Sequence, residues 1–204
     1  MRIKVYVEGG GTGHALRTAC HRGFRALFER AGLPGRMLNI DAGGSRAETF
    51  KDFCRALRSA EPDEFLCLLV DSEDPVDGNK SPWAFLRERQ ADQWAKPPAA
   101  SDDNAHLMVQ CMESWFLADP GAVERFFKLD RNALPRRTEP ERTPKRDVFA
   151  TLERATHACT KGSYQKARHS FALLATLDPD KVSASPYARR LFDTLRRRAQ
   201  GPEA

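Results

Sequence analysis

The sequence lacks any apolar run that approaches the roughly 18 residues needed for a membrane-spanning helix. Residues 1–5 alternate charged and apolar side chains, without the apolar segment of a signal peptide, and lead directly into a strand-like pattern. These absences predict a cytoplasmic protein that does not associate with a membrane.

Cysteine pairs suited to a disulfide framework or a structural zinc site are also lacking. The five cysteines are odd in number and widely spaced, and no two of them form a Cys-x-x-Cys pair. This pattern argues against both kinds of site. Cys67 lies inside an apolar run and is expected to be a small core residue.

The two halves of the chain carry charge of opposite sign. The 204 residues are 41% hydrophobic and 30% charged, which suits a soluble globular protein of one domain, or of one domain with an appendage. Residues 1–124 hold 15 basic and 19 acidic side chains, whereas residues 125–204 hold 18 and 9. The basic half could bind a polyanion, or it could simply present an arginine-rich helical surface to solvent.

Two apolar runs end abruptly at carboxylates. Residues 4–7 lead into Glu8 and a glycine-rich turn, and residues 65–70 lead into Asp71-Ser72-Glu73-Asp74. A continuous apolar run of this kind is typical of a buried strand in a parallel sheet. Because ligand sites in such sheets lie outside the carboxyl ends of the strands, we expect these acids to share one crevice.

Strand and helix patterns alternate along the first 120 residues. Strands are expected at residues 2–8, 37–42, 65–70 and 106–111, and helices at residues 15–31 and 46–59 and from Ser81-Pro82 onward. Further helices are expected at residues 145–158, 163–176 and 186–199. This order predicts an α/β fold with a mostly parallel sheet of about four strands, flanked by helices. We expect residues 1–128 to form this core with the acidic site, and residues 129–204 a basic helical extension packed on it.

The turn after Glu8 differs from two common phosphate-binding loops. No Gly-Lys-Ser/Thr follows it, as a P-loop requires, and the third glycine of a dinucleotide-binding fingerprint is absent. A strand that ends in Glu-Gly suits another arrangement, in which Gly9, Gly10 and Gly11 let a metal-bound phosphate approach the backbone. His14 follows the turn closely enough to contact the same phosphate.

The acids after the central strand favour a divalent metal. Alternate residues of an extended segment point the same way, so Asp71 and Glu73 can present oxygens to one ion. Oxygen ligands without His or Cys indicate Mg²⁺, Mn²⁺ or Ca²⁺ rather than zinc. An acidic surface loop would have the same composition, but the position after the most hydrophobic strand favours a functional site. Glu113, set among large apolar side chains, could ligate a metal or pair with Arg46.

Three blocks of the sequence resemble a family of bacterial Toprim-like proteins close to the RloB-like group. The blocks are Val7-Glu8-Gly9, Val70-Asp71-Ser72-Glu73-Asp74 and Cys111-Met112-Glu113-Ser114-Trp115-Phe116-Leu117. The resemblance covers residues 1–120, and residues 162–171 are similar to the tail of the same subfamily. These proteins are similar to the nuclease domains of the OLD family and often occur with ATPases in phage-defence loci. The Toprim pattern has a second Asp where this chain has Glu73, so either Glu73 or the adjacent Asp74 would bind metal.

The resemblance implies a Toprim-like core and a metal-dependent phosphodiesterase that cuts nucleic acid. Asp71 with Glu73 or Asp74 would hold Mg²⁺ or Mn²⁺, and Glu8 would be a further ligand or the general base for the attacking water. Glu113 would complete a second ion site. Cationic side chains would hold the phosphate backbone; they are Arg46, Lys161, Lys166 and His169.

Two other functions are compatible with the sequence. The same fold could be a non-catalytic subunit that docks to an ATPase or senses a nucleotide, with exposed Trp83 and Trp94 and the Pro- and Arg-rich segment 130–144 as contact surface. A nucleotidyl transferase would use the same acids and metal but would need a nucleoside triphosphate pocket. The sequence favours neither DNA nor RNA, because it shows no aromatic ladder and no recognised DNA-reading helix motif.

Overall fold

The computed structural model describes residues 1–11, 13–78, 80–136 and 139–201. The strands are β1 (Arg2–Gly10), β2 (Leu38–Gly44), β3 (Glu64–Asp71) and β4 (Ala105–Met108). The α-helices are α1 (His14–Arg30), α2 (Arg46–Leu57), α3 (Pro82–Glu88), α4 (Ser114–Ala118), α5 (Pro120–Phe127), α6 (Lys145–Thr156), α7 (Lys166–Leu174), α8 (Pro179–Val182) and α9 (Pro186–Gln200). Short 3-10 helices lie at Gly35–Met37, Asp102–Asn104 and Pro140–Arg142. None of the helices in the described ranges combines the length and apolar character needed to cross a membrane.

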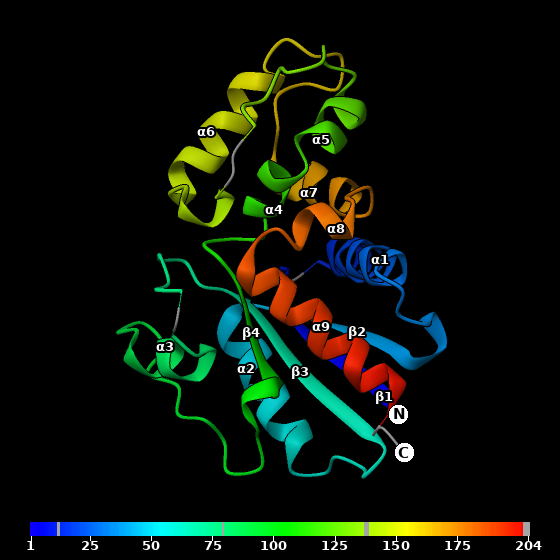
Figure 1. Cartoon of the computed structure of the whole chain (residues 1–204), viewed down its shortest axis with the longest axis vertical. Helices are drawn as coiled ribbons and strands as arrows, with labels where there is room; N and C mark the ends of the chain where they lie inside the picture. The colour runs from blue at the N-terminus through cyan, green and yellow to red at the C-terminus, as the bar shows by residue number, and fades with distance from the viewer. Residues whose placement is uncertain (12, 79, 137–138, 202–204) are drawn as a thin grey trace.

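The strands form one parallel sheet. Their order is β2-β1-β3-β4, and each neighbouring pair runs in the same direction. Helices lie on both faces, with α1 and α9 in front of the sheet and α2 behind it in Figure 1. The predicted α/β fold with about four parallel strands and a helical C-terminal part is confirmed.

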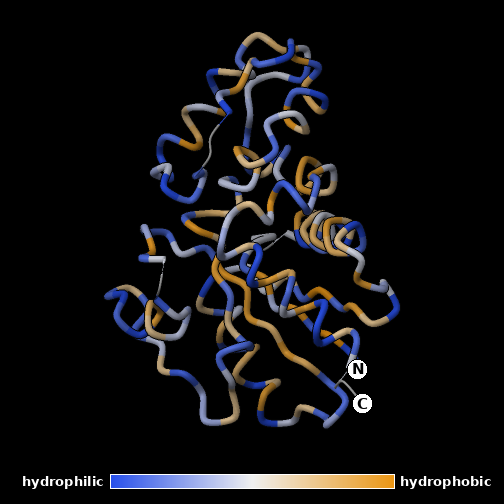
Figure 2. The backbone as a smooth tube through the Cα atoms, viewed as in Figure 1, coloured by the Kyte–Doolittle hydropathy of each residue, from blue (hydrophilic) through white to orange (hydrophobic). Residues whose placement is uncertain are grey.

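Alternating side chains of the strands build an apolar core on each face of the sheet. On one face, Val5 and Leu69 belong to a cluster that also contains Phe24 of α1 and Phe192 of α9. On the other face, Leu68 belongs to a separate cluster with side chains of α2 and α3. Because both faces are buried, β3 is hydrophobic along almost its whole length, as Figure 2 shows.

Short polar side chains fix the helix starts that position the site. Ser45 begins α2 with a reciprocal capping box, in which its hydroxyl accepts from the Glu48 amide and the Glu48 carboxylate accepts from the Ser45 amide. Ser81 and Asp119 cap α3 and α5 with a single side-chain acceptor, for the Ala84 and Ala122 amides, ahead of a proline in the first turn. The start of α3 at Ser81-Pro82 is therefore where the sequence predicts it.

Helices from the basic half pack directly on the sheet and its first helix. α7 lies along α1, and the contact is so close that a Cβ at Gly23 would lie 2.6 Å from the Phe171 carbonyl oxygen. α9 crosses β4 and β1. Side chains from both sides of residue 128 join one continuous apolar cluster. The domain boundary expected between residues 128 and 129 stays a prediction.

The fourth strand is shorter than expected. It ends at Met108 rather than at residue 111, because the chain then turns toward α4. The backbone pairing nevertheless continues for two more bonds: the Ser72 amide donates to the Met108 carbonyl at 3.0 Å, and the Glu73 amide donates to the Gln110 carbonyl at 2.8 Å. These bonds hold the acidic segment after β3 in place.

The expectation of two exposed tryptophans is wrong. Trp83 is 4% exposed, and its indole N–H donates to the Ser101 carbonyl at 2.9 Å. Trp94 is partly buried and stacks on Phe50, with ring centroids 4.1 Å apart. Both side chains cover the α2 side of the sheet instead of forming a contact surface.

His106 of β4 is held in its neutral form. Its Nε2 faces the Asp103 carbonyl at 2.9 Å, and the Arg190 guanidinium donates to its Nδ1 at 3.1 Å. Burial, together with the positive charge of Arg190, lowers the pKa of His106 to about 3. In the unfolded chain His106 binds a proton below about pH 6.5, whereas in the folded protein it does so only near pH 3. The free energy of unfolding therefore decreases as the pH falls through that range.

Replacing His106 with Gln should make the free energy of unfolding less sensitive to acid. Between pH 7 and pH 5 the wild-type protein should lose about 1–2 kcal/mol more than His106→Gln, because Gln does not titrate. Urea denaturation followed by circular dichroism at both pH values measures the difference. Equal losses in the two proteins would show that His106 is not the acid-sensitive group.

Candidate metal centre

Three carboxylates meet at the carboxyl ends of the two central strands. Glu8 of β1, Asp71 of β3 and Glu73 just beyond β3 each place an oxygen within 4.8 Å of the others. The chain leaves β1 toward β2 on one side and returns to β3 on the other, so this point is where the strand order reverses. Ligands of open parallel sheets bind in the crevice at such a point.

Asp71 is the most buried of the three acids. Its Oδ1 accepts a hydrogen bond from the Met112 amide at 2.8 Å, and its own amide donates to Glu8 Oε2 at 3.2 Å. Burial, reinforced by the negative charges of Glu113 and Glu8, raises the pKa of Asp71 to about 8. An ionised Asp71 therefore requires a cation close by.

Arg46, the first residue of α2, fixes Glu8. It donates to Glu8 Oε2 at 2.9 Å and also to the Asp71 backbone carbonyl. Its other nitrogens make a bidentate pair with Asp92 at 2.8 and 2.7 Å, and its guanidinium lies over the Trp94 ring. Arg46 is thus engaged with the protein, and its place is beside Glu8 rather than beside Glu113.

Backbone geometry decides which acid after Asp71 joins the cluster. Glu73 has φ +67°, a left-handed conformation that is uncommon for a residue other than glycine and occurs often at functional sites. Its carboxylate lies with Glu8 and Asp71 and pairs with Lys145. The neighbouring Asp74 lies outside this group, is 61% exposed and pairs with Arg89 at 2.9 Å.

Glu113 is connected to the cluster through a lysine. It is fully buried at the turn before α4, and its Oε1 accepts from the Tyr164 hydroxyl at 3.2 Å. Its Oε2 has no hydrogen-bond partner among the described residues. Lys166 Nζ lies 3.8 Å from Glu113 Oε2 and 3.8 Å from Asp71 Oδ2. Burial lowers the pKa of Lys166, but the carboxylates of Glu113 and Asp71 outweigh it and leave the pKa raised.

These residues suit a hard divalent cation. Each ligand candidate offers a carboxylate oxygen, the donor that Mg²⁺ and Mn²⁺ prefer. Glu113 Oε2, which has no hydrogen-bond partner among the described residues, is a further carboxylate oxygen nearby. Lys166 Nζ lies 3.8 Å from it and 3.8 Å from Asp71 Oδ2. A buried carboxylate oxygen without a partner destabilises the folded protein. A cation among these acids would reduce the repulsion between their negative charges and would give the unpartnered oxygen a ligand bond.

A cavity of about 360 Å³ opens beside the acids. Gly9, Gly10 and Gly11 form one wall, and all three have positive φ. A Cβ at Gly10 would lie 2.9 Å from Arg17 Cα, so a side chain there would force the loop away from α1. Lys166 at the start of α7 forms part of the opposite wall. The first turn of α7, which carries no acidic side chain, thus lies at the cavity together with the carboxylates of Glu8 and Asp71.

Three of the expected phosphate contacts lie away from the cavity. His169 is buried, accepts from the Gln165 amide through Nδ1 at 3.0 Å and packs on Phe127. Lys161 lies over the Phe126 ring at 3.7 Å. His14 is the exposed first residue of α1 and is not among the described residues that line the cavity. His169 is therefore a packing residue, and of Lys161, Lys166 and His169 only Lys166 reaches the acids.

Sequence reasoning missed Lys145, Asp92 and the hydrogen bond from Tyr164. Lys145 is the first residue of α6, and only the long fold-back of the chain brings it to Glu73. Asp92 follows α3 in a loop without a recognisable motif, yet its side chain is 2% exposed because it receives Arg46. The proline before Lys145 marks a helix start, but nothing local in the sequence indicates what that start faces.

The Arg46 bridge should contribute far more stability than an exposed ion pair on the same helix. Arg46→Met leaves Asp92 and Glu8 without their partner in a largely buried position and should cost about 3–5 kcal/mol in unfolding free energy. The matched control Arg55→Met removes an exposed pair with Asp52 and should cost less than about 1 kcal/mol.

Urea denaturation of the two variants measures both costs. Adding Asp92→Asn to Arg46→Met should recover part of the loss, because the unpaired buried charge is then removed. Similar stabilities for Arg46→Met and Arg55→Met would contradict the bridging role.

Comparison with known proteins gives a family but no characterised relative. No curated protein and no solved structure matches the chain. One family model, described as "Domain of unknown function (DUF4276)", matches residues 7–196. The match takes in Glu8, the acids after β3, Glu113 and Lys166. Because it spans most of the 204 residues, the chain belongs to the DUF4276 family.

Proposed function

We propose that this protein is a metal-dependent phosphodiesterase that acts on nucleic acid. The observation that carries the proposal is the convergence of Glu8, Asp71 and Glu73 at the reversal of strand order, next to a cavity with a lysine at its edge. Carboxylates that converge on a cavity suit metal-assisted phosphoryl chemistry, because an ion there would face a bound phosphate.

The metal would be Mg²⁺ or Mn²⁺, held by Glu8, Asp71 and Glu73. Glu113 contributes an additional oxygen to the same region and would serve a second ion. When bound, such an ion supplies charge stabilisation at the phosphoryl oxygens and lowers the pKa of a water molecule.

The side chains around the acids have distinct tasks in hydrolysis of a phosphodiester. Arg46 and the Asp71 amide hold Glu8 Oε2, so that Glu8 would serve either as a ligand of the ion or as the general base that accepts the proton of the attacking water. Lys166 and the start of α7 hold the non-bridging phosphate oxygens. Water oxygen bonds to phosphorus, the bond to the leaving oxygen breaks, and solvent protonates the released alkoxide.

The Toprim-like resemblance supports this proposal. The three sequence blocks that carry it are far apart in the chain, yet Glu8, Asp71 with Glu73, and Glu113 gather at one edge of the sheet. A nuclease of the RloB-like or OLD type would place its acids in the same way. We propose accordingly that the protein works in a phage-defence or restriction-type system, with an ATPase as partner.

Glutamine substitutions test the site with a neighbouring acid as control. Glu8→Gln and Glu73→Gln should each lower Mn²⁺-dependent cleavage of DNA or RNA by at least about a hundredfold, since each removes a charged oxygen from the cluster. Asp74→Asn should keep nearly full activity, because Asp74 pairs with Arg89 outside the cluster. Cleavage of labelled single- and double-stranded substrates gives the rates, and thermal melting confirms folding.

A measurement of metal binding distinguishes a nuclease from a non-catalytic regulatory subunit. Calorimetric binding of Mn²⁺ that is lost in Glu8→Gln, without cleavage of any substrate, would turn the assignment toward a regulatory subunit. Undiminished cleavage by a folded Glu8→Gln protein would refute the assignment of the active site.

A further inference from the structure

A second hollow, unrelated to the acidic cluster, is lined mainly by cations. It has a volume of about 560 Å³ and lies over α5, the loop that follows it and the end of α8. Its charged lining residues are Glu124, Arg125, Lys128, Arg131, Arg136 and Lys181. Among the described residues, none lines both this hollow and the cavity beside the acids.

Two of the five cations have acidic partners within the protein. Arg136 donates to both oxygens of the buried Glu124, at 2.9 and 3.2 Å, and Lys181 pairs with the buried Asp119 at 3.0 Å. The Glu124 carboxylate also accepts from the Leu134 amide. These bonds fix Arg136 and Lys181 at the rim, so that part of the hollow is built rather than formed by free surface side chains.

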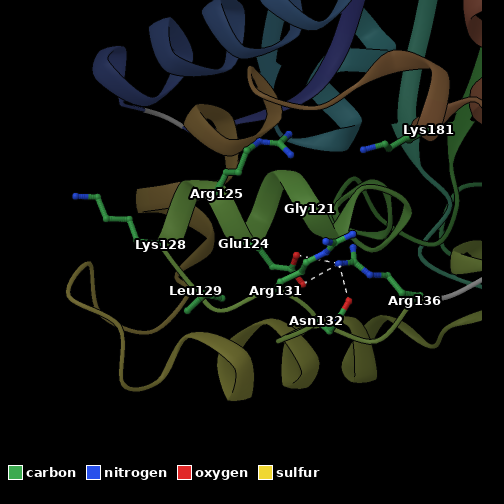
Figure 3. A pocket seen from close by; sticks show the side chains of 9 residues that line it. All are labelled: Gly121, Glu124, Arg125, Lys128, Leu129, Arg131, Asn132, Arg136 and Lys181. Atoms are coloured by element: carbon green, nitrogen blue, oxygen red, sulfur yellow. Dashed lines mark hydrogen bonds and ion pairs between the residues drawn. The ribbon is translucent and has the colours of Figure 1, made fainter.

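The other three cations have no such partner. Arg125, Lys128 and Arg131 are exposed, and within the described ranges no carboxylate forms an ion pair with any of them. Figure 3 shows the guanidinium groups of Arg131 and Arg136 pointing toward one another, and Arg125 and Lys181 doing the same on another side of α5. The hollow therefore carries an excess of three positive charges, and an anion between the groups of either pair would relieve their repulsion, whereas Lys128 points away from both pairs in Figure 3.

We propose that this hollow binds phosphate groups of a nucleic-acid backbone. Planar guanidinium groups match phosphate oxygens through paired hydrogen bonds, and three of the five cations are arginines. No described lining residue is aromatic, so the hollow offers no platform for stacking a base. Contact would be with phosphates alone, independent of sequence and sensitive to salt.

The choice of nucleic acid as the source of the phosphates rests on the proposed function, but binding does not require cleavage. A polymer held at α5 would be retained by a surface remote in sequence from Glu8 and Asp71. The hollow would thus raise the affinity for the nucleic-acid backbone, and the acidic cluster would determine which bond is cleaved.

Binding of a short labelled oligonucleotide in EDTA tests the proposal apart from catalysis. The variant Arg125→Gln/Lys128→Gln/Arg131→Gln removes the three unpaired cations and leaves the pairs of Arg136 and Lys181 in place. Fluorescence anisotropy should show binding at low salt weakened roughly tenfold or more, and a slope of log K against log salt reduced by about two to three.

The matched control removes the same charge elsewhere. Arg30→Gln/Arg36→Gln/Arg58→Gln changes three exposed arginines located at the other end of the sheet, near the starts of the strands. This control should bind the oligonucleotide like the wild-type protein. Equal weakening in both triple variants would show general charge attraction and overturn the site.

Two competitors identify the source of the anion. Inorganic tripolyphosphate should displace the oligonucleotide only weakly, and poly-glutamate should not displace it. Tight calorimetric binding of tripolyphosphate that depends on the three cations, with unchanged oligonucleotide binding, would assign the hollow to a free phosphate ligand instead. Equal binding of poly-glutamate would overturn its phosphate character. Loss of binding with the triple variant would support the site even if no cleavage were found.

Discussion

Carboxylates at one edge of the sheet repel one another, and the fold places cations from three helices beside them. Glu8, Asp71 and Glu73 lie within 4.8 Å of one another, and Glu113 approaches them from the turn before α4. The pKa of Asp71, raised to about 8 chiefly by burial and by its acidic neighbours, expresses the cost of keeping a charge there. Strongly raised carboxyl pKa values of this kind are concentrated at functional sites of proteins.

Three cations from distant parts of the chain offset this repulsion. Arg46 comes from the start of α2, Lys145 from the start of α6 and Lys166 from the start of α7. The last two are among the 18 basic side chains of residues 125–204, so part of the positive charge of that half offsets the acids of the first half. Packing of α7 on α1 and of α9 on β4 brings the basic half to the acids. The apolar contacts therefore determine where the charges meet.

Much of the framework could be predicted from local sequence. The apolar run before Asp71, the glycines after Glu8 and the Ser81-Pro82 helix start each reflect a short-range rule, and the parallel α/β sheet followed from their order. The acids Glu8, Asp71 and Glu73 were predicted because parallel strands end at one edge. Whether Glu73 or Asp74 joins the acidic cluster could not be predicted, because it depends on the left-handed backbone at Glu73 and on the ion pair of Asp74 with Arg89. Lys145 and Asp92 were missed because their partners are 72 and 46 residues away.

Anomalous scattering from crystals soaked in Mn²⁺ would show directly whether these acids bind a metal. We expect an anomalous peak at about 2.1 Å, a typical distance for small hard cations, from carboxylate oxygens of Glu8, Asp71 and Glu73. The peak should disappear in crystals of Glu8→Gln. An empty cluster in crystals that bind Mn²⁺ elsewhere would contradict the assignment of these acids as a metal centre.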